Sequence, residues 1–262
     1  MLGLGANITS ASALEQSLAL PNDLGDMVHY FKHKTGITND SGVSAWVDQI
    51  GTANLAQSDD DRRPAYDAST GAVDFSNIQI SDISDRLEFA SDQVFPAAFT
   101  IFFVADLKAY GSGDGQYHGF SHSTAASNIN FYDATSTLSD TFFQMSLKEG
   151  SDTDSGVNSA TNPDLLHNVK SLVVVTVTDI DGGTIKCYFG GNDANASSIN
   201  EAHSSTLGGD NAFGILRIGH NSASPTRQLG GELFEWGTYS KALSAEEVEN
   251  LFAGIKARGL IG

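Results

Sequence analysis

The chain has 262 residues, of which 40% are hydrophobic, 27 are glycine and only 5 are proline. This composition suits a large core with many turns and argues against intrinsic disorder. The formal net charge of −18, from 14 basic and 32 acidic residues, argues against a nucleic-acid partner, because phosphate recognition needs clustered lysine and arginine. Since all-β sandwiches often reach this length as one unit, we expect a single folded domain.

Residues 1–20 are small and polar, and we interpret them as an N-terminal arm that precedes a folded domain of residues 21–262. The arm has no basic region followed by an apolar segment, and the chain has no run of about 18 apolar residues. We therefore expect neither secretion nor insertion into a membrane, and assembly in the cytoplasm.

The body of the chain is predicted to consist of strands. Val28 and Tyr30 belong to the first, and runs of β-branched and aromatic residues between Gly, Asp, Asn and Ser predict the others. These runs are residues 86–90, 99–106, 117–122, 130–133, 141–148, 172–178, 184–189 and 215–219. Residues 232–239 alternate apolar and polar side chains, which predicts a half-buried strand. The apolar run 172–175 predicts a central strand covered on both faces, and residues 179–183 predict a hairpin turn after it. Residues 35–38 are expected to form a polar turn. We predict an all-β fold, a two-sheet antiparallel jelly-roll β-sandwich.

One helix is predicted with clear ends, after the last strand. Ser244 is the expected N-cap, with Glu247 three residues later completing a capping box, and Gly259 can adopt the left-handed conformation that ends a helix. An apolar stripe at helical spacing contains Val248, Leu251, Phe252 and Ile255. Because this helix follows some two hundred residues of strand and turn, we expect it to pack on the outside of the sandwich.

Three residues are predicted to have structural roles. The single cysteine, Cys187, cannot form an internal disulfide and lies in an apolar run, so we expect a small buried hydrophobe. Trp46 is expected in the core and Asp48 in a turn.

The C-terminal segment resembles the end of domains in the concanavalin A-like lectin/glucanase superfamily, in its laminin-G-like branch. The matching residues are Gly230, Glu232, Glu235, Tyr239, Ser240, Ala242, Leu243, Ser244 and Glu247. The Trp-x-Asp-Gln-x-Gly segment at 46–51 and the segments 63–66 and 71–75 are similar to the first half of such domains. With the opening residues 2–7, the chain resembles modules in virion structural proteins of tailed phages, especially marine ones.

The phage resemblance implies a non-enzymatic virion structural protein on the outer surface of the head. It implies a capsid decoration protein that binds the major capsid protein or other virion proteins, as a homo-oligomer, through its arm and a sandwich edge. The capsid-anchoring residues expected in the arm are Leu2, Leu4, Ile8, Leu14 and Leu18. The lectin-like fold leaves an alternative open, a carbohydrate-binding adhesin on a tail or head fibre that recognises a host-surface glycan.

The sequence argues against glycoside hydrolysis. The glucanases of the superfamily carry Glu-x-Asp-x-x-Glu on one strand, which places two carboxylates on one face, and this chain lacks that motif. Glu232 and Glu235 are three residues apart, so a regular strand would point them to opposite faces. We expect one at a rim and the other in a hydrogen bond beneath the terminal helix.

No cofactor or metal is predicted, although calcium at the acidic runs 59–61 and 152–156 stays open as an alternative. Two pairs of histidines, His29 with His33 and His118 with His122, are four residues apart. Along a strand this spacing separates the two side chains by about 13 Å, so we do not expect either pair to bind zinc. The glycine-rich segment 111–115 lacks the lysine and helix of a phosphate loop. Aromatic residues that could serve as sugar platforms, but that more often pack in a core, are Tyr110, Tyr117, Phe131, Tyr132 and Tyr239.

Overall fold

The computed structural model describes residues 21–75, 85–107, 169–180, 182–191, 218–219 and 229–262. It also describes the backbone of residues 120–121, 127–133, 143–149, 152–154, 158–159, 200–206 and 214–217.

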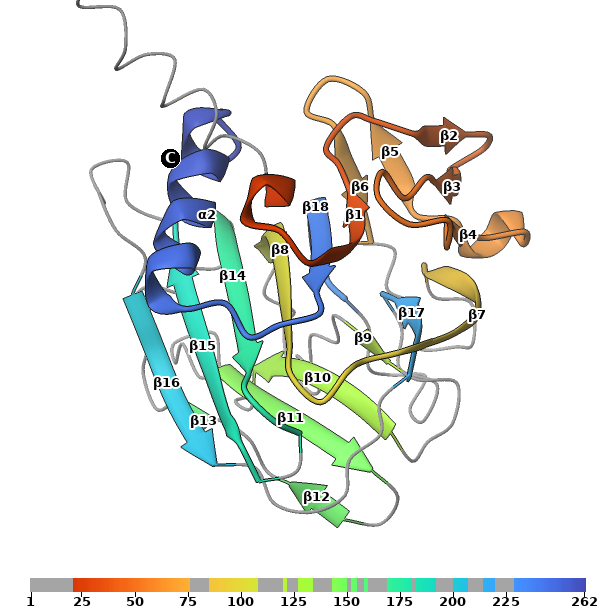
Figure 1. Cartoon of the computed structure of the whole chain (residues 1–262). Coiled ribbons are helices and arrows are strands. Elements are labelled where there is room, and N and C mark those ends of the chain that lie inside the picture. The colour runs from red at the N-terminus through yellow and green to blue at the C-terminus, as the bar shows by residue number, and fades with distance from the viewer. Residues whose placement is uncertain are drawn as a thin grey trace, which may run out of the picture.

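Eight strands form one antiparallel sheet, here called sheet A (Figure 1). Their order is β16 (Asn200–Thr206), β15 (Thr184–Gly190), β14 (Lys170–Val177), β8 (Phe99–Leu107), β18 (Gly231–Tyr239), β6 (Ala72–Asp74) and β5 (Ala65–Asp67). The eighth strand, β1 (Met27–Phe31), pairs with the second half of β18, so strands from both ends of the described chain lie side by side.

Ten strands form the second antiparallel sheet, sheet B. Their order is β12 (Asp152–Asp154), β11 (Phe143–Glu149), β10 (Ser127–Asp133), β9 (Phe120–Ser121), β17 (Gly214–Ile218), β7 (Leu87–Val94), β4 (Leu55–Ala56), β3 (Val43–Trp46) and β2 (Ile37–Asn39), with β13 (Asn158–Ser159) paired to β11. Two short 3₁₀ helices, η1 (Pro21–Leu24) and η2 (Asp60–Arg62), complete the described elements before the last helix. The predicted two-sheet antiparallel jelly-roll sandwich is confirmed.

The C-terminal helix α2 (Ala245–Ala257) packs on the outer face of sheet A, next to β14 (Figure 1). Both hydrogen bonds of the predicted capping box are present between Ser244 and Glu247, and Gly259 has a φ of 69°. The four stripe residues are buried, in one cluster with apolar side chains of β8 and β14. No helix among the described residues is long and apolar enough to cross a membrane.

The central strands are buried on both faces because one face meets sheet B and the other meets α2. In β8, Ile101 and Phe103 belong to the cluster between the sheets, whereas Phe102 and Val104 belong to the cluster under the helix. Strand β14 lies between β8 and β15 and alternates in the same way, as the apolar run predicted. Trp46 and Cys187 are fully buried, and burial raises the pKa of the Cys187 thiol well above its usual range.

Two details of the sequence interpretation are corrected. Residues 35–38 were expected to form a turn, but Ile37–Asn39 forms β2, because residues 37 to 39 pair with β3. Strand β18, expected to be half-buried, has every residue but Glu232 buried, because β1 and β8 pair with it and its side chains enter both core clusters.

Candidate functional site

The predicted anchoring residues Leu2, Leu4, Ile8, Leu14 and Leu18 lie outside the described residues. The segment that follows them is described, and we call Pro21 to Asp26 the arm root. Pro21 is buried, and η1 packs against α2.

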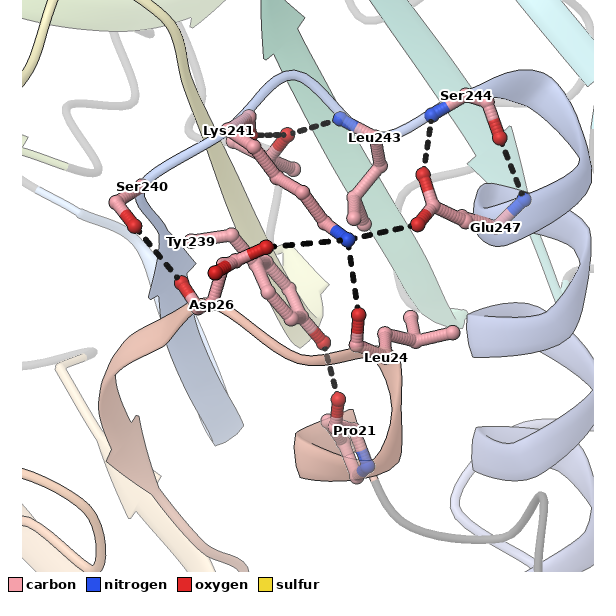
Figure 2. A network of polar contacts seen from close by, with 10 residues as sticks. Pro21, Leu24, Asp26, Tyr239, Ser240, Lys241, Leu243, Ser244 and Glu247 are labelled. Atoms are coloured by element: carbon pink, nitrogen blue, oxygen red, sulfur yellow. Dashed lines mark hydrogen bonds and ion pairs between the residues drawn. The ribbon is translucent and has the colours of Figure 1, made fainter.

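Polar contacts hold the arm root on the end of β18 and the start of α2 (Figure 2). The fully buried Tyr239 donates its hydroxyl to the carbonyl oxygen of Pro21 at 2.8 Å. The Lys241 ammonium donates to the carbonyl oxygen of Leu24 at 2.9 Å, and the backbone N–H of Ser240 donates to that of Asp26 at 2.8 Å. These hydrogen bonds fix the arm root to the domain.

The same lysine connects the arm root to the capping box. Its ammonium donates to Glu247 Oε1 at 2.8 Å, while Glu247 Oε2 accepts from the backbone N–H of Ser244 at 2.8 Å (Figure 2). The hydrogen bond between the two side chains raises the pKa of Lys241 and lowers the pKa of the Glu247 carboxyl. Both groups stay charged at neutral pH, and Lys241 also pairs with Asp26 at 3.5 Å, so this lysine links the arm root to the first turn of α2.

A buried ion pair lies at the other end of α2. Arg258 donates from Nη1 to Glu235 Oε2 at 2.7 Å and from Nη2 to Oε1 at 2.5 Å. The Glu235 side chain is fully buried and also accepts from the hydroxyl of Tyr30 at 3.1 Å. Burial alone would lower the pKa of Arg258, but the hydrogen bonds and charge of Glu235 outweigh it and raise that pKa. Glu235 thus forms the hydrogen bond beneath the terminal helix that the sequence predicted.

The expectation that Glu232 and Glu235 point to opposite faces is wrong. Leu233 and Trp236 both belong to the cluster between the sheets although they are three residues apart, because β18 has a bulge between Leu233 and Glu235. Glu232 lies on the helix side of sheet A, because the next residue, Leu233, faces sheet B. The bulge turns Glu235 to the same side. Arg258 and Tyr30 engage the Glu235 carboxylate.

A second buried polar pair joins β1 to the turn after β3. His29 Nδ1 lies 2.7 Å from Asp48 Oδ2, and Asp48 Oδ1 accepts from the backbone N–H groups of Tyr30 at 2.9 Å and Ile50 at 3.1 Å. Burial opposes ionisation of Asp48, but the bonds from His29 and the backbone outweigh it and lower the pKa of that carboxyl. The predicted turn role of Asp48 is confirmed.

Replacing Asp48 with asparagine should destabilise the domain by about 1–3 kcal/mol at neutral pH, since the backbone donors lose a charged acceptor. The pKa of Asp48 is lower in the folded than in the unfolded chain, so its contribution is present above the unfolded value, near 4, and is lost as the pH falls through the folded value. Urea unfolding between pH 7 and pH 3 should therefore show the difference from the parent shrinking below about pH 4. D61N, at an exposed carboxylate, is the control; an equal difference at every pH would contradict this account.

Beside this pair is a pocket of about 340 Å³ between β1, the end of β18 and the segment joining β7 to β8. Its lining residues are Val28, His29, Gln93, Phe95, Pro96, Thr238, Tyr239 and Ser240. The exposed large apolar side chains of the described residues, Val28, Val47 and Ile50, all lie on β1 or just after β3. This pocket could not be predicted from the sequence, because its walls come from three segments far apart in the chain.

The other predicted candidates have separate environments. His33 Nε2 bonds the carbonyl oxygen of Thr70, so it does not share a partner with His29. In the acidic run, Asp59 caps η2 and pairs with Arg62, and Asp60 pairs with Arg63. No group of three or more His, Cys, Asp or Glu in the described part of the chain is placed to hold a metal ion.

Of the aromatic residues weighed as sugar platforms, Tyr239 is fully buried and serves the core and the arm root. The side chains of Tyr110, Tyr117, Phe131 and Tyr132 lie outside the described residues, as do His118, His122 and the segment 111–115. Of the run 152–156, the backbone of β12 is described.

No protein-family model and no characterised protein sequence matches the chain. Solved structures do. The binding domain of botulinum neurotoxin DC in complex with SialylT superposes with a TM-score of 0.56 at 12% identity, over 90% of this chain and 52% of that one. What the two chains share is the fold, a jelly-roll β-sandwich.

Two further jelly rolls are similar. A GH54 α-L-arabinofuranosidase soaked with 4-nitrophenyl α-L-arabinofuranoside gives a TM-score of 0.53 at 14% identity, over 81% of this chain and 51% of that one. A SAP-like pentraxin from Limulus polyphemus gives a TM-score of 0.45 at 14% identity, over 63% of this chain and 73% of that one. The chain spans about half the length of the toxin and arabinofuranosidase chains. The similarity to the toxin domain and the arabinofuranosidase, at 12% and 14% identity, shows the shared fold and nothing about activity.

Proposed function

We propose that the chain is a non-enzymatic structural protein of a tailed-phage virion that decorates the head and binds the major capsid protein. Residues 1–20 are the anchoring arm in this proposal, and the sandwich is displayed on the outer surface, as one subunit of a homo-oligomer. The proposal starts from the resemblance of the opening segment and of residues 46–51 to modules of such proteins.

The observation that carries the proposal is the arm root. An anchor holds a domain in place only if its attachment point is firm, because a frayed attachment would add conformational freedom that binding has to remove. Here the carbonyl oxygens of Pro21, Leu24 and Asp26 are bonded to the end of β18 and its neighbour Lys241. A force on the arm would therefore act on sheet A and α2 through these hydrogen bonds.

Deleting residues 1–20 should abolish binding to phage heads that lack the protein, while the domain keeps its unfolding midpoint. Co-sedimentation of the full and truncated chains with such heads measures the first, and thermal unfolding measures the second. A matched variant keeps the arm but replaces Leu2, Leu4, Ile8, Leu14 and Leu18 with serine, and it should also fail to bind. If the truncated chain binds heads as the full chain does, the arm is not the anchor and this proposal is wrong.

A carbohydrate-binding adhesin on a fibre is the second candidate, and the jelly-roll fold is compatible with it. The neurotoxin binding domain and the arabinofuranosidase named above were solved with sugars, but at their low identity they lend this chain only the fold. Glycan binding would survive deletion of residues 1–20, so binding of the truncated chain to host-surface polysaccharide separates the two candidates.

A further inference from the structure

The pocket beside β1 has room for a substituted ring. Its volume of about 340 Å³ lies at the lower end of the range of small-ligand pockets, about 300–1,000 Å³. An apolar cavity of about 150 Å³ already accepts benzene in an engineered protein. A six-membered ring with one or two substituents therefore fits this space, whereas a longer chain would extend into solvent.

One lining residue of the pocket, Thr238, has a side-chain hydroxyl without a hydrogen-bond partner among the described residues. Thr238 is 1% exposed, and its Oγ1 makes no hydrogen bond with any described residue. Leaving a buried hydroxyl unpaired costs free energy, so such a group in a pocket wall marks a place where a ligand atom would complete the bonding.

His29 stands directly opposite Thr238 in the β1–β18 pairing, which places the two side chains about 5 Å apart at their Cβ atoms. Asp48 is an ionised acceptor, so an N–H on Nδ1 of His29 points to it, and in the neutral tautomer that this hydrogen bond selects the lone pair is on Nε2. Nε2 bonds to no described residue. A ligand hydroxyl both donates and accepts hydrogen bonds. It could donate to Nε2 of His29 and accept from the hydroxyl of Thr238.

The remaining walls select against a strongly polar ligand. Val28, Phe95, Pro96 and the buried Tyr239 contribute apolar surface, and no described lining residue is acidic or carries a permanent positive charge. The two other polar lining residues already donate hydrogen bonds, Gln93 to the carbonyl oxygen of Ser91 and Ser240 to that of Asp26. A fully hydroxylated sugar would turn several hydroxyls toward these walls, where each would lose its water without gaining a partner. A ring with a single hydroxyl meets no such penalty.

We propose that this pocket binds a phenol group, with its hydroxyl between His29 and Thr238 and its ring against Phe95 and Pro96. The phenol belongs either to a free aromatic alcohol or to a tyrosine side chain, which present the same chemistry to the pocket. The proposal does not depend on the virion role.

Isothermal titration calorimetry of the full chain with p-cresol and with toluene tests the proposal. p-Cresol should bind at least about tenfold more tightly than toluene, because toluene has the same ring and methyl group but no hydroxyl. T238V, which replaces the hydroxyl by a methyl group of similar size, should remove that difference and leave toluene binding unchanged. N-acetyl-L-tyrosinamide separates the sources: binding like that of p-cresol indicates a tyrosine side chain, and no binding indicates a free aromatic alcohol.

A matched pair of variants locates the binding. V28W should block the pocket and abolish p-cresol binding, whereas V47W should not, since Val47 is equally exposed at 38% but lies outside the pocket lining. The proposal is overturned if p-cresol does not bind, if it binds no more tightly than toluene, or if V28W and V47W bind it equally. Binding of a methyl pentoside that T238V abolishes, without p-cresol binding, would also overturn it and would favour the adhesin.

Discussion

Replacing Arg258 with methionine should lower the free energy of unfolding by about 3–5 kcal/mol. The substitution leaves the fully buried carboxylate of Glu235 without its counter-charge, and only the Tyr30 hydroxyl and the distant N–H of His33 remain as donors. An uncompensated charge in such a place costs far more than the loss of a surface pair, for which the usual value is below about 1 kcal/mol. Urea unfolding at neutral pH, followed by circular dichroism, measures the effect.

The double variant E235L/R258M should recover most of this loss, because it replaces the ion pair by apolar side chains and leaves no buried charge. K256M is the matched control, since Lys256 lies in the same last turn of α2 and stacks over Phe252 without touching Glu235. If R258M costs no more than K256M, the pair is screened by water and does not hold α2 on the sheet.

Features set by neighbouring residues could be predicted from the sequence. The capping box, the apolar stripe of α2 and the stop at Gly259 all depend on side chains within one or two helical turns, and all three are present. Strand β14 was predicted as central because its residues are apolar on both faces, a property that needs no knowledge of its partners.

Features that depend on pairing between distant segments were not predicted. The strands β4, β5 and β6 have two or three residues, too few to show a period of two. The bulge in β18 reverses the direction expected for Glu235, and a bulge in such a run leaves no mark in the residue types. The pocket exists because β1 pairs with β18, more than 200 residues later, and the arm root is built by the same pairing.

Replacing Trp46 with alanine should lower the free energy of unfolding by about 3–5 kcal/mol. The size of this loss tests whether the motif at 46–51 belongs to the core or to a binding surface. The side chain is fully buried, with its ring centroid 5.8 Å from that of Phe31, and its Nε1 donates to the carbonyl oxygen of Lys32 at 3.3 Å. Alanine would leave a large cavity between β3 and β1, and the carbonyl oxygen of Lys32 would keep only the backbone N–H of Thr35 as a donor.

V47A is the matched control for W46A, because Val47 is the next residue and is 38% exposed, so its truncation should change stability by no more than about 0.5 kcal/mol. Circular dichroism in urea is the appropriate readout, since the chain has only two tryptophans and W46A removes one of them. A fully folded W46A with the stability of V47A would mean that the ring does not hold the two sheets together. The Trp-x-Asp-Gln-x-Gly segment would then have to serve the binding of a partner. The expected loss of stability would instead show that Trp46 holds this segment in the core, where Asp48 positions His29 at the wall of the pocket.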